Sequence, residues 1–260
     1  MEPLLEVRDL TVTFPSADGE TAVVDRASLT VGRGELVGLV GESGSGKSMT
    51  ALAVLRLVPP PGRIAGGSIR FAGRELLELH EREMRRVRGG AIGIVFQEPA
   101  SALNPVFSIG FQIREVLRLH RGLAARAARE EAVRLLDKVA LPAARKRLDD
   151  YPYQLSGGQR QRVMVAMALA AGPRLLLADE PTTALDVTLQ AQVLDLLAGL
   201  AEELGLSVLL ITHDLAVVAE TCRRAAVMQR GRIVEEAPVA DLFRRPKHAY
   251  TKTLVAAALA

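Results

Sequence analysis

Residues 41–48 read Gly41-Glu42-Ser43-Gly44-Ser45-Gly46-Lys47-Ser48 and match the pattern GxxxxGK(S/T). They follow the short apolar run Leu36 to Val40 and precede residues 48–58, where apolar side chains recur at helical spacing until three prolines. A strand, a glycine loop and a helix in this order bring inward-facing N–H groups and the positive end of the helix to one point. The stretch therefore predicts an anion-binding loop in an α/β core.

The last two residues of this loop suit a nucleotide that carries a magnesium ion. Lys47 can reach the β- and γ-phosphates, and the Ser48 hydroxyl can ligate a Mg²⁺ ion that bridges them. The predicted ligand is therefore a Mg-nucleotide. Many unrelated nucleoside triphosphatases contain such a loop, so this motif leaves the activity of the chain open.

An acidic pair follows a second apolar run. Residues 175–180 read Leu-Leu-Leu-Ala-Asp-Glu, which predicts a buried strand that ends in two carboxylates. At the carboxyl edge of a parallel sheet such acids lie beside the phosphates. We expect Asp179 to hold Mg²⁺ through water, and Glu180 to orient or deprotonate the attacking water.

The composition is that of an ordinary globular chain. Of its 260 residues, 49% are hydrophobic and 24% are charged, and 33 basic against 30 acidic residues give a net charge of +3, too even a balance to suggest nucleic-acid binding. The single cysteine, Cys222, forms no internal disulfide and indicates a reducing compartment. The N-terminal stretch lacks the basic and apolar regions of a signal peptide, and the apolar runs are too short to cross a bilayer. We expect the chain to be in the cytosol and to act at a membrane only through another chain.

The remaining pattern alternates strands and helices. Short β-branched runs between residues 4 and 31, broken by a turn at 16–19, predict an antiparallel β region. Residues 108–171 have helical character almost throughout, which predicts an inserted helical lobe. Further strands are expected at 68–71, 92–96, 174–178 and 207–212, and further helices at 81–88, 188–204 and 247–260.

Residues 155–159 read Leu-Ser-Gly-Gly-Gln, and this motif between the glycine loop and the acidic pair resembles the ATP-binding cassette (ABC) family. The resemblance implies an α/β fold: a P-loop NTPase (RecA-like) core with an N-terminal antiparallel β region and an inserted helical sub-domain. It implies one ABC ATPase domain over 1–260, with the core at 1–98 and 172–237, the helical sub-domain at 99–171 and a helical tail at 238–260. It also implies a head-to-tail dimer in which residues 156–159 of one subunit contact the ATP on the loop of the other.

Further positions match the family in order. The resemblance implies that Gln97 contacts the magnesium or its water, that His213 hydrogen-bonds the γ-phosphate, and that Asp186, after Ala184 and Leu185, lies at the dimer seam. Phe14 stands where relatives stack an aromatic ring on adenine, although a core position in its strand would explain it equally well. The expected catalytic residues are Lys47, Gln97, Glu180 and His213, and the expected metal ligands are Ser48, Gln97 and Asp179. The expected nucleotide contacts are Phe14, Gly41, Glu42, Ser43, Gly44, Ser45, Gly46, Lys47, Ser48, Met49, Ser156, Gly157, Gly158, Gln159 and Asp186.

Residues 98–105 and 245–252 resemble the dipeptide, oligopeptide and nickel importer branch. The implied function is ATP hydrolysis coupled to uptake of peptides or of nickel and metal chelates, at the cytoplasmic face of the inner membrane. The implied partners are a second, non-identical ABC ATPase, two transmembrane permease subunits and an extracytoplasmic solute-binding protein. The permease would dock on residues 101–107 and 151–154. Many peptide-importer subunits continue beyond the position of residues 248–251, so the short end resembles the nickel or metallophore members, or a truncated form.

Two alternatives stay open. One is the ATPase of an exporter or lipoprotein-release system, which the two branch-specific stretches do not favour. The other is a soluble ABC protein that acts on ribosomes or DNA; such proteins contain two cassettes or long coiled coils, whereas this sequence shows one cassette. The sequence decides neither the solute nor whether the dimer is formed by identical subunits.

Overall fold

The computed structural model describes residues 2–17, 19–98, 102–183 and 186–259. The chain divides into two compact units, one of residues 1–84 with 201–260 and the other of residues 85–200. Two helices cross these boundaries, α2 (Glu81–Val87) and α8 (Val187–Leu204). Among the residues that the structure describes, no helix is both long and apolar enough to cross a lipid bilayer.

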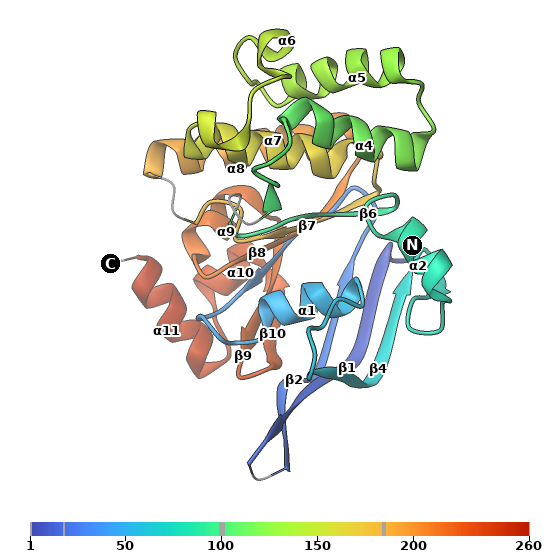
Figure 1. Ribbon diagram of the computed structural model, residues 1–260. Coiled ribbons are helices and arrows are strands. Elements are labelled where there is room, and N and C mark those ends of the chain that lie inside the picture. The colour runs from blue at the N-terminus through green and yellow to red at the C-terminus, as the bar shows by residue number, and fades with distance from the viewer. Residues whose placement is uncertain (1, 18, 99–101, 184–185, 260) are drawn as a thin grey trace. The chain divides into compact units, whose positions relative to one another are not determined.

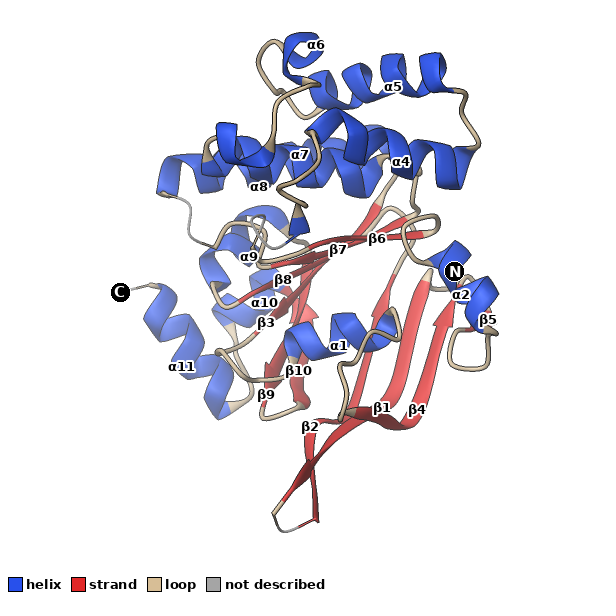
Figure 2. Cartoon of the chain, viewed as in Figure 1, coloured by secondary structure: helices blue, strands red, loops and turns tan. Residues whose placement is uncertain are grey.

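The first unit contains an antiparallel sheet with the strand order β2-β1-β4-β5 (Figure 1 and Figure 2). Its strands are β1 (Leu5–Ser16), β2 (Gly19–Val31), β4 (Arg63–Phe71) and β5 (Arg74–Glu75). The predicted antiparallel β region is therefore confirmed, but β1 and β2 form one long hairpin where the sequence predicts several short runs. Asp9 and Arg26 adopt positive φ angles of 46° and 49°, and the β1–β2 register shifts three times between Val7 and Thr13. Such bulges interrupt the alternation of apolar side chains, and the sequence pattern breaks with it.

The same unit contains the parallel strands of the α/β core. Strand β3 pairs in parallel with both β8 and β9, and β10 pairs with β9 in antiparallel fashion. Every side chain of β8 and nearly every one of β3 is buried, as expected for a parallel sheet covered on both faces. These strands are β3 (Leu36–Val40), β8 (Ser207–Thr212), β9 (Arg224–Gln229) and β10 (Arg232–Pro238), and the helices are α1 (Lys47–Val54), α9 (Leu215–Thr221), α10 (Val239–Arg244) and α11 (Ala249–Ala258).

Three elements of this unit, α1, β4 and α11, differ from the sequence-based expectations by two residues or more. Helix α1 ends at Val54 instead of continuing to Val58, because Arg56 turns into the left-handed region with φ 52° and the Leu57 amide donates to the Leu52 carbonyl at 2.8 Å. Strand β4 begins five residues before the predicted strand at 68–71, and α11 is shorter than the predicted helix at 247–260.

The sequence pattern does not predict the β9–β10 hairpin. A two-residue turn joins its strands, with Arg230 at φ 47° and Gly231 at φ 81°. Two-residue hairpin turns with two positive φ angles are usually marked by Asn-Gly or Asp-Gly. Here Arg230 precedes the glycine, so the sequence lacks the usual signal for this hairpin.

The second unit is largely helical, and Figure 2 shows its helices in blue. Helices α4, α5, α6 and α7 pack on one another, and α7 also contacts strand β6. These helices are α4 (Ile109–Arg121), α5 (Ala125–Lys138), α6 (Ala144–Arg147) and α7 (Gly157–Leu169), with a 3-10 turn at Pro152–Gln154 and the parallel strands β6 (Ile92–Val95) and β7 (Leu175–Asp179). The predicted helical character of residues 108–171 is thus observed, whereas the predicted sub-domain boundaries stay a prediction.

Candidate functional site

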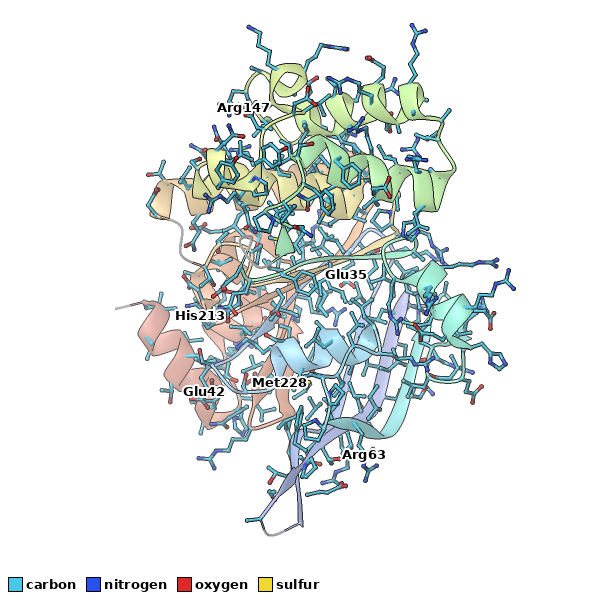
Figure 3. All side chains as sticks on the ribbon, viewed as in Figure 1. Glu35, Glu42, Arg63, Arg147, His213 and Met228 are labelled. Carbon is cyan, nitrogen blue, oxygen red and sulfur yellow. The ribbon has the colours of Figure 1, made fainter. Side chains whose placement is uncertain are left out.

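The glycine loop of residues 41–48 begins directly after β3 and leads into α1. Gly46 adopts φ 106°, a conformation that strains any side chain, and a Cβ atom there would lie 2.6 Å from the Val23 carbonyl oxygen. A Cβ atom on Gly41 would lie 2.1 Å from the carbonyl oxygen of Met228. Figure 3 labels Met228, which lies in β9. The loop therefore lies against the backbone of two strands and has no room for side chains at these two positions.

Backbone hydrogen bonds fix the middle of the loop to the β9–β10 turn. The Gly231 amide donates to the Ser45 carbonyl at 2.9 Å, and the Asp25 amide donates to the Gly231 carbonyl at 2.8 Å. The Ser45 amide donates to the Glu42 carbonyl at 3.2 Å, which closes a turn inside the loop. The curled conformation of the loop is thus stabilised by backbone N–H and C=O groups, which are present whatever the side chains are.

The ammonium group of Lys47 lies on the start of its own loop. Its Nζ donates to the carbonyl oxygens of Gly41 at 2.8 Å and of Glu42 at 2.9 Å, and the residue is 4% exposed. A buried ammonium group needs such partners, because desolvation of an unpaired charge is expensive. The structure therefore holds Lys47 at the loop, where the sequence predicts a phosphate contact.

Tyr250, near the C-terminus, reaches the same loop. Its hydroxyl accepts a hydrogen bond from the Glu42 amide at 2.8 Å, although the two residues are 208 positions apart. Burial raises the pKa of the Tyr250 hydroxyl and outweighs the lowering effect of the Glu42 amide, so the hydroxyl stays protonated at neutral pH. The sequence predicts residues 245–252 only as a mark of the importer branch, and no local spacing links Tyr250 to the loop.

His213 follows β8 at the edge of the sheet where β3 enters the loop. Thr212 pairs with Val40 in the parallel register, so His213 and Gly41 follow paired residues of adjacent strands. The His213 side chain is exposed, and the next residue, Asp214, caps α9 by accepting from the Ala216 amide at 2.8 Å. This placement agrees with a contact to a ligand on the loop, and that role stays a prediction.

Phe14 lies in β1 and is half-buried. Its ring lies directly against Gly62, where a Cβ atom would approach the Phe14 Cζ atom to 2.4 Å. This contact gives the ring a packing role in the first unit, and the predicted adenine stack stays a prediction.

In the second unit, the acidic pair and Gln97 follow neighbouring parallel strands. Val95 of β6 pairs with Ala178 of β7, so Gln97 and Asp179 leave the sheet at the same edge. The Gln97 Nε2 atom donates to the Oε2 atom of Glu180 at 3.1 Å. The structure thus brings together two side chains to which the sequence assigns separate roles.

A threonine that the sequence does not predict completes the arrangement around Glu180. The Thr183 hydroxyl donates to the same Oε2 atom at 2.8 Å, and the Thr183 amide donates to the Glu180 carbonyl at 3.2 Å. Glu180 adopts φ 45°, which is rare for a residue with a side chain, and is only 9% exposed. Strained backbone of this kind persists only where its surroundings enforce it, and it gathers at functional sites. The Gln97 amide and the Thr183 hydroxyl both donate to one oxygen of Glu180, and together they orient its carboxylate.

The Leu-Ser-Gly-Gly-Gln motif begins helix α7 with a capping box. The Ser156 hydroxyl accepts from the Gln159 amide at 3.4 Å, and the Gln159 side chain accepts from the Ser156 amide at 3.1 Å. Gly158 is buried against Leu189 of α8, whereas Ser156 and Gly157 are exposed. Ser156 and Gln159 thus cap helix α7, and the N-terminus of the helix is exposed at Ser156 and Gly157.

Asp186 directly precedes helix α8. Its side chain accepts from the Leu189 amide at 2.9 Å, as an N-cap residue does. Its predicted position at a dimer seam stays a prediction. The neighbouring matches Ala184 and Leu185 lie outside the described residues.

A glycine loop between a buried parallel strand and a helix, inside an α/β core, defines the class of phosphate-loop nucleoside triphosphatase folds. The sequence profile described as ABC transporter matches residues 24–183, and the chain belongs to the ABC transporter family. The predicted family and fold are therefore confirmed.

Named relatives cover almost the whole chain. A protein of Brucella abortus (strain 2308), described as a candidate peptide import ATP-binding protein, is 51% identical over 255 residues, which make up 98% of this chain and 77% of that protein. A protein of Sinorhizobium fredii, described as a candidate peptide ABC transporter ATP-binding protein, is 51% identical over 253 residues, which make up 97% and 76% of the two chains.

Two solved structures share the fold. The ATP-binding cassette MJ0796, a dimer in a post-hydrolysis state bound to ADP and Pi, matches with a TM-score of 0.81 and 29% identity over 90% of this chain and 98% of that one. The protein cbiO1 from Clostridium perfringens, part of the ABC transporter complex cbiONQ, matches with a TM-score of 0.80 and 25% identity over 94% and 92% of the two chains.

Proposed function

We propose that this chain is the ATP-binding and ATP-hydrolysing subunit of an ABC transporter that imports peptides. The observation that carries the proposal is the phosphate loop, with Lys47 held at its start by two carbonyl oxygens. The names of the relatives at 51% identity favour peptides as the solute. Uptake of nickel or metal chelates, which the sequence left open, has no specific observation in its favour.

In this proposal, residues 41–49 bind the phosphates of ATP through backbone amides and the Lys47 ammonium group. Lys47 would exchange its two carbonyl partners for β- and γ-phosphate oxygens, which are stronger acceptors because they are charged. Phe14 would stack on the adenine ring. His213, exposed at the end of β8, would donate to the γ-phosphate.

Glu180 would orient and deprotonate the attacking water in the hydrolysis step. Gln97 and Thr183 support this role, because their bonds to one carboxylate oxygen fix the direction of the group. The described residues contain no cluster of three or more His, Cys, Asp or Glu side chains that could hold a metal ion. The proposed ligands Ser48, Gln97 and Asp179 all offer oxygen atoms, which fits a Mg²⁺ ion that is bound largely through nucleotide phosphates. When bound, Mg²⁺ would neutralise charge on the phosphates.

A head-to-tail dimer would supply the remaining contacts. The exposed Ser156 and Gly157 at the N-terminus of α7 would face the γ-phosphate on the other subunit, where the helix dipole favours an anion. Asp186 would lie at the seam. The dimeric state of MJ0796 with ADP and Pi supports a dimer. We expect a non-identical paralogue as the second subunit.

An exposed aromatic surface in the second unit is the proposed docking site for a permease subunit. It comprises Val106, Phe107, Phe111, Tyr151 and Tyr153, of which Val106 is 72% and Tyr153 67% exposed. The rings of Phe107 and Phe111 stack with centroids 4.7 Å apart, as do those of Tyr151 and Tyr153 at 5.7 Å. Exposed patches of apolar and aromatic side chains mark interaction sites.

Backbone bonds hold the two parts of this aromatic surface beside each other. The Ile109 amide donates to the Asp150 carbonyl at 2.9 Å, and the Gly110 amide donates to the Leu148 carbonyl at 2.8 Å. Val106, Phe107, Tyr151 and Tyr153 of this surface lie within the predicted docking segments 101–107 and 151–154, whereas Leu103 is buried and residue 101 lies outside the described residues. Docking there would place the chain peripherally on the cytoplasmic face of the membrane, in a complex with an extracytoplasmic solute-binding protein.

The proposal is tested by two measurements on the full chain. Purified protein should bind ATP and hydrolyse it with Mg²⁺, and Lys47→Ala should raise the Kd for ATP about tenfold or more because a charge-assisted contact is removed.

Capture of the tagged chain from its native membranes should recover permease subunits and a second ATPase. Ser substitutions at Phe107 and Tyr153 should abolish that recovery, whereas Leu119→Ser, at an exposed leucine outside the aromatic surface, should not. Recovery of ribosomal or DNA-repair proteins without membrane chains would reject the transporter.

A further inference from the structure

A series of hydrogen bonds connects strand β10 to the phosphate loop through the C-terminal helix. The carboxylate of Glu235 accepts from two consecutive backbone amides, those of Lys247 and His248, at 2.9 Å each. His248 then caps α11, because its Nδ1 atom accepts from the Tyr250 amide at 3.2 Å. The Tyr250 hydroxyl accepts from the Glu42 amide at 2.8 Å.

Helix α11 is firmly packed at the point where it presents Tyr250. Thr251 and Val255 are buried, and the helix contacts α9, which itself packs on β3 and β8. Burial alone would raise the pKa of Glu235, but hydrogen-bond donors, the His248 amide first among them, lower it below its usual value. The carboxylate therefore stays charged at neutral pH and keeps both amide contacts.

Tyr250 and Lys47 hold opposite sides of the same residue. The Glu42 carbonyl accepts from Lys47, whereas the Glu42 amide donates to Tyr250. If Lys47 turns to a phosphate, the first contact is lost and the second does not depend on it. Tyr250 thus keeps the first turn of the loop in place while the loop holds a ligand.

We infer that Tyr250 is a positioning residue for the phosphate loop, and that the C-terminal helix thereby sets the affinity of the chain for its nucleotide. The inference rests on the proposed nucleotide binding. Without the hydroxyl, the Glu42 amide loses its partner and the loop is less well ordered before binding, so that part of the binding free energy is used to order it.

Tyr250→Phe tests this role because it removes one oxygen atom and keeps the ring. Loss of one ordinary hydrogen bond should raise the Kd for ATP about fivefold. The KM for ATP should rise by a similar factor while kcat is unchanged, a separation that general loss of folded protein would not produce. Thr253→Val is the matched control, because it removes a hydroxyl from an exposed position of the same helix.

The outcomes separate the two proposals. The positioning role is supported if the wild type binds ATP, Tyr250→Phe has a raised Kd for ATP and Thr253→Val has the wild-type Kd. Equal Kd values for both variants, or a lowered kcat with unchanged Kd, would overturn it while leaving nucleotide binding intact. If wild type and Lys47→Ala show the same absence of ATP binding, the proposed function fails and the inference fails with it.

A second variant tests the route through the helix. Glu235→Gln replaces one acceptor oxygen by a donor, so it removes one of the two amide contacts and should raise the Kd for ATP by a smaller factor. Because Glu235 acts through Tyr250, the double variant should bind like Tyr250→Phe alone, within about twofold. Multiplicative effects of the two substitutions would contradict the route.

Discussion

The phosphate loop and the carboxylate edge are held in place in different ways. The loop is fixed by main-chain groups, with the Gly231 amide on one side and the Met228 carbonyl against Gly41 on the other. Glu180 is instead fixed by side chains, the Gln97 amide and the Thr183 hydroxyl. Although side chains such as Tyr250 also hold the loop in place, a Cβ atom at Gly41 or Gly46 would first meet backbone carbonyl oxygens. The loop should therefore be most sensitive to added volume, whereas the carboxylate edge should be most sensitive to isosteric changes of polar atoms.

The largest effect is expected for Glu180→Gln, which keeps the shape of the side chain and removes its basicity. The rate of ATP hydrolysis should fall by about 10²- to 10⁴-fold, the usual contribution of a positioned general base, while ATP binding is kept. The measurement is steady-state hydrolysis beside equilibrium ATP binding, and the ATP-bound dimer should accumulate in size-exclusion chromatography. Unchanged hydrolysis would remove Glu180 from the mechanism.

At the loop, Gly41→Ala should destabilise the folded chain, because the added methyl group would lie 2.1 Å from the Met228 carbonyl. Overpacking of this kind costs about 1–3 kcal/mol, and thermal unfolding measures it as a lowered Tm. Gly199→Ala is the control, since its helical position has open space and the change should be stabilising. Equal Tm values for both variants would show that the loop and the Met228 carbonyl move apart to accommodate the added methyl group.

A smaller effect is expected for Thr183→Val, which keeps the volume and removes the hydroxyl that donates to the Glu180 carboxylate. The rate constant kcat should fall about fivefold, the value of one ordinary hydrogen bond, with the Kd for ATP unchanged. A raised Kd instead would contradict the separation between a loop that binds and a carboxylate edge that hydrolyses.

The smallest effect is expected at Cys222, which belongs to neither region. Burial raises the pKa of its thiol to about 12, against a lesser lowering by the Thr221 hydroxyl, so the thiol stays protonated well above neutral pH. Alkylating reagents should leave native protein unmodified at pH 8 and label it after denaturation, as mass spectrometry would show. Labelling of the folded chain would mean that Cys222 is more accessible than its 7% exposure indicates.

The sequence predicted the parts of the fold and site whose signals are local. The loop at 41–48 and the pair Asp179–Glu180 each lie within a few residues of the strand that positions them, so spacing alone identified them. Thr183 has a local signal too, a hydroxyl three residues after the acid, but threonine is too common in turns to be distinctive.

The parts that were not predicted depend on contacts between distant residues. Tyr250 and Met228 reach the loop only after β9, β10 and α11 have folded beside β3, and no spacing encodes that proximity. The hairpin β1–β2 was predicted in pieces because bulges at Asp9 and Arg26 disrupt the alternation. The end of α1 was misplaced because Arg56, rather than a glycine, adopts the left-handed conformation.

The Glu235 carboxylate, which accepts two neighbouring amides, has a consequence for isotope exchange. The backbone N–H groups of Lys247 and His248 lie outside any helix or strand, yet both are hydrogen-bonded, as is that of Glu42 in its exposed loop. In deuterated water these three protons should be retained longer than those of ordinary loops, and they should be released together when helix α11 detaches. Slow exchange in two segments that look like solvent-exposed turns would thus report the integrity of the C-terminal helix.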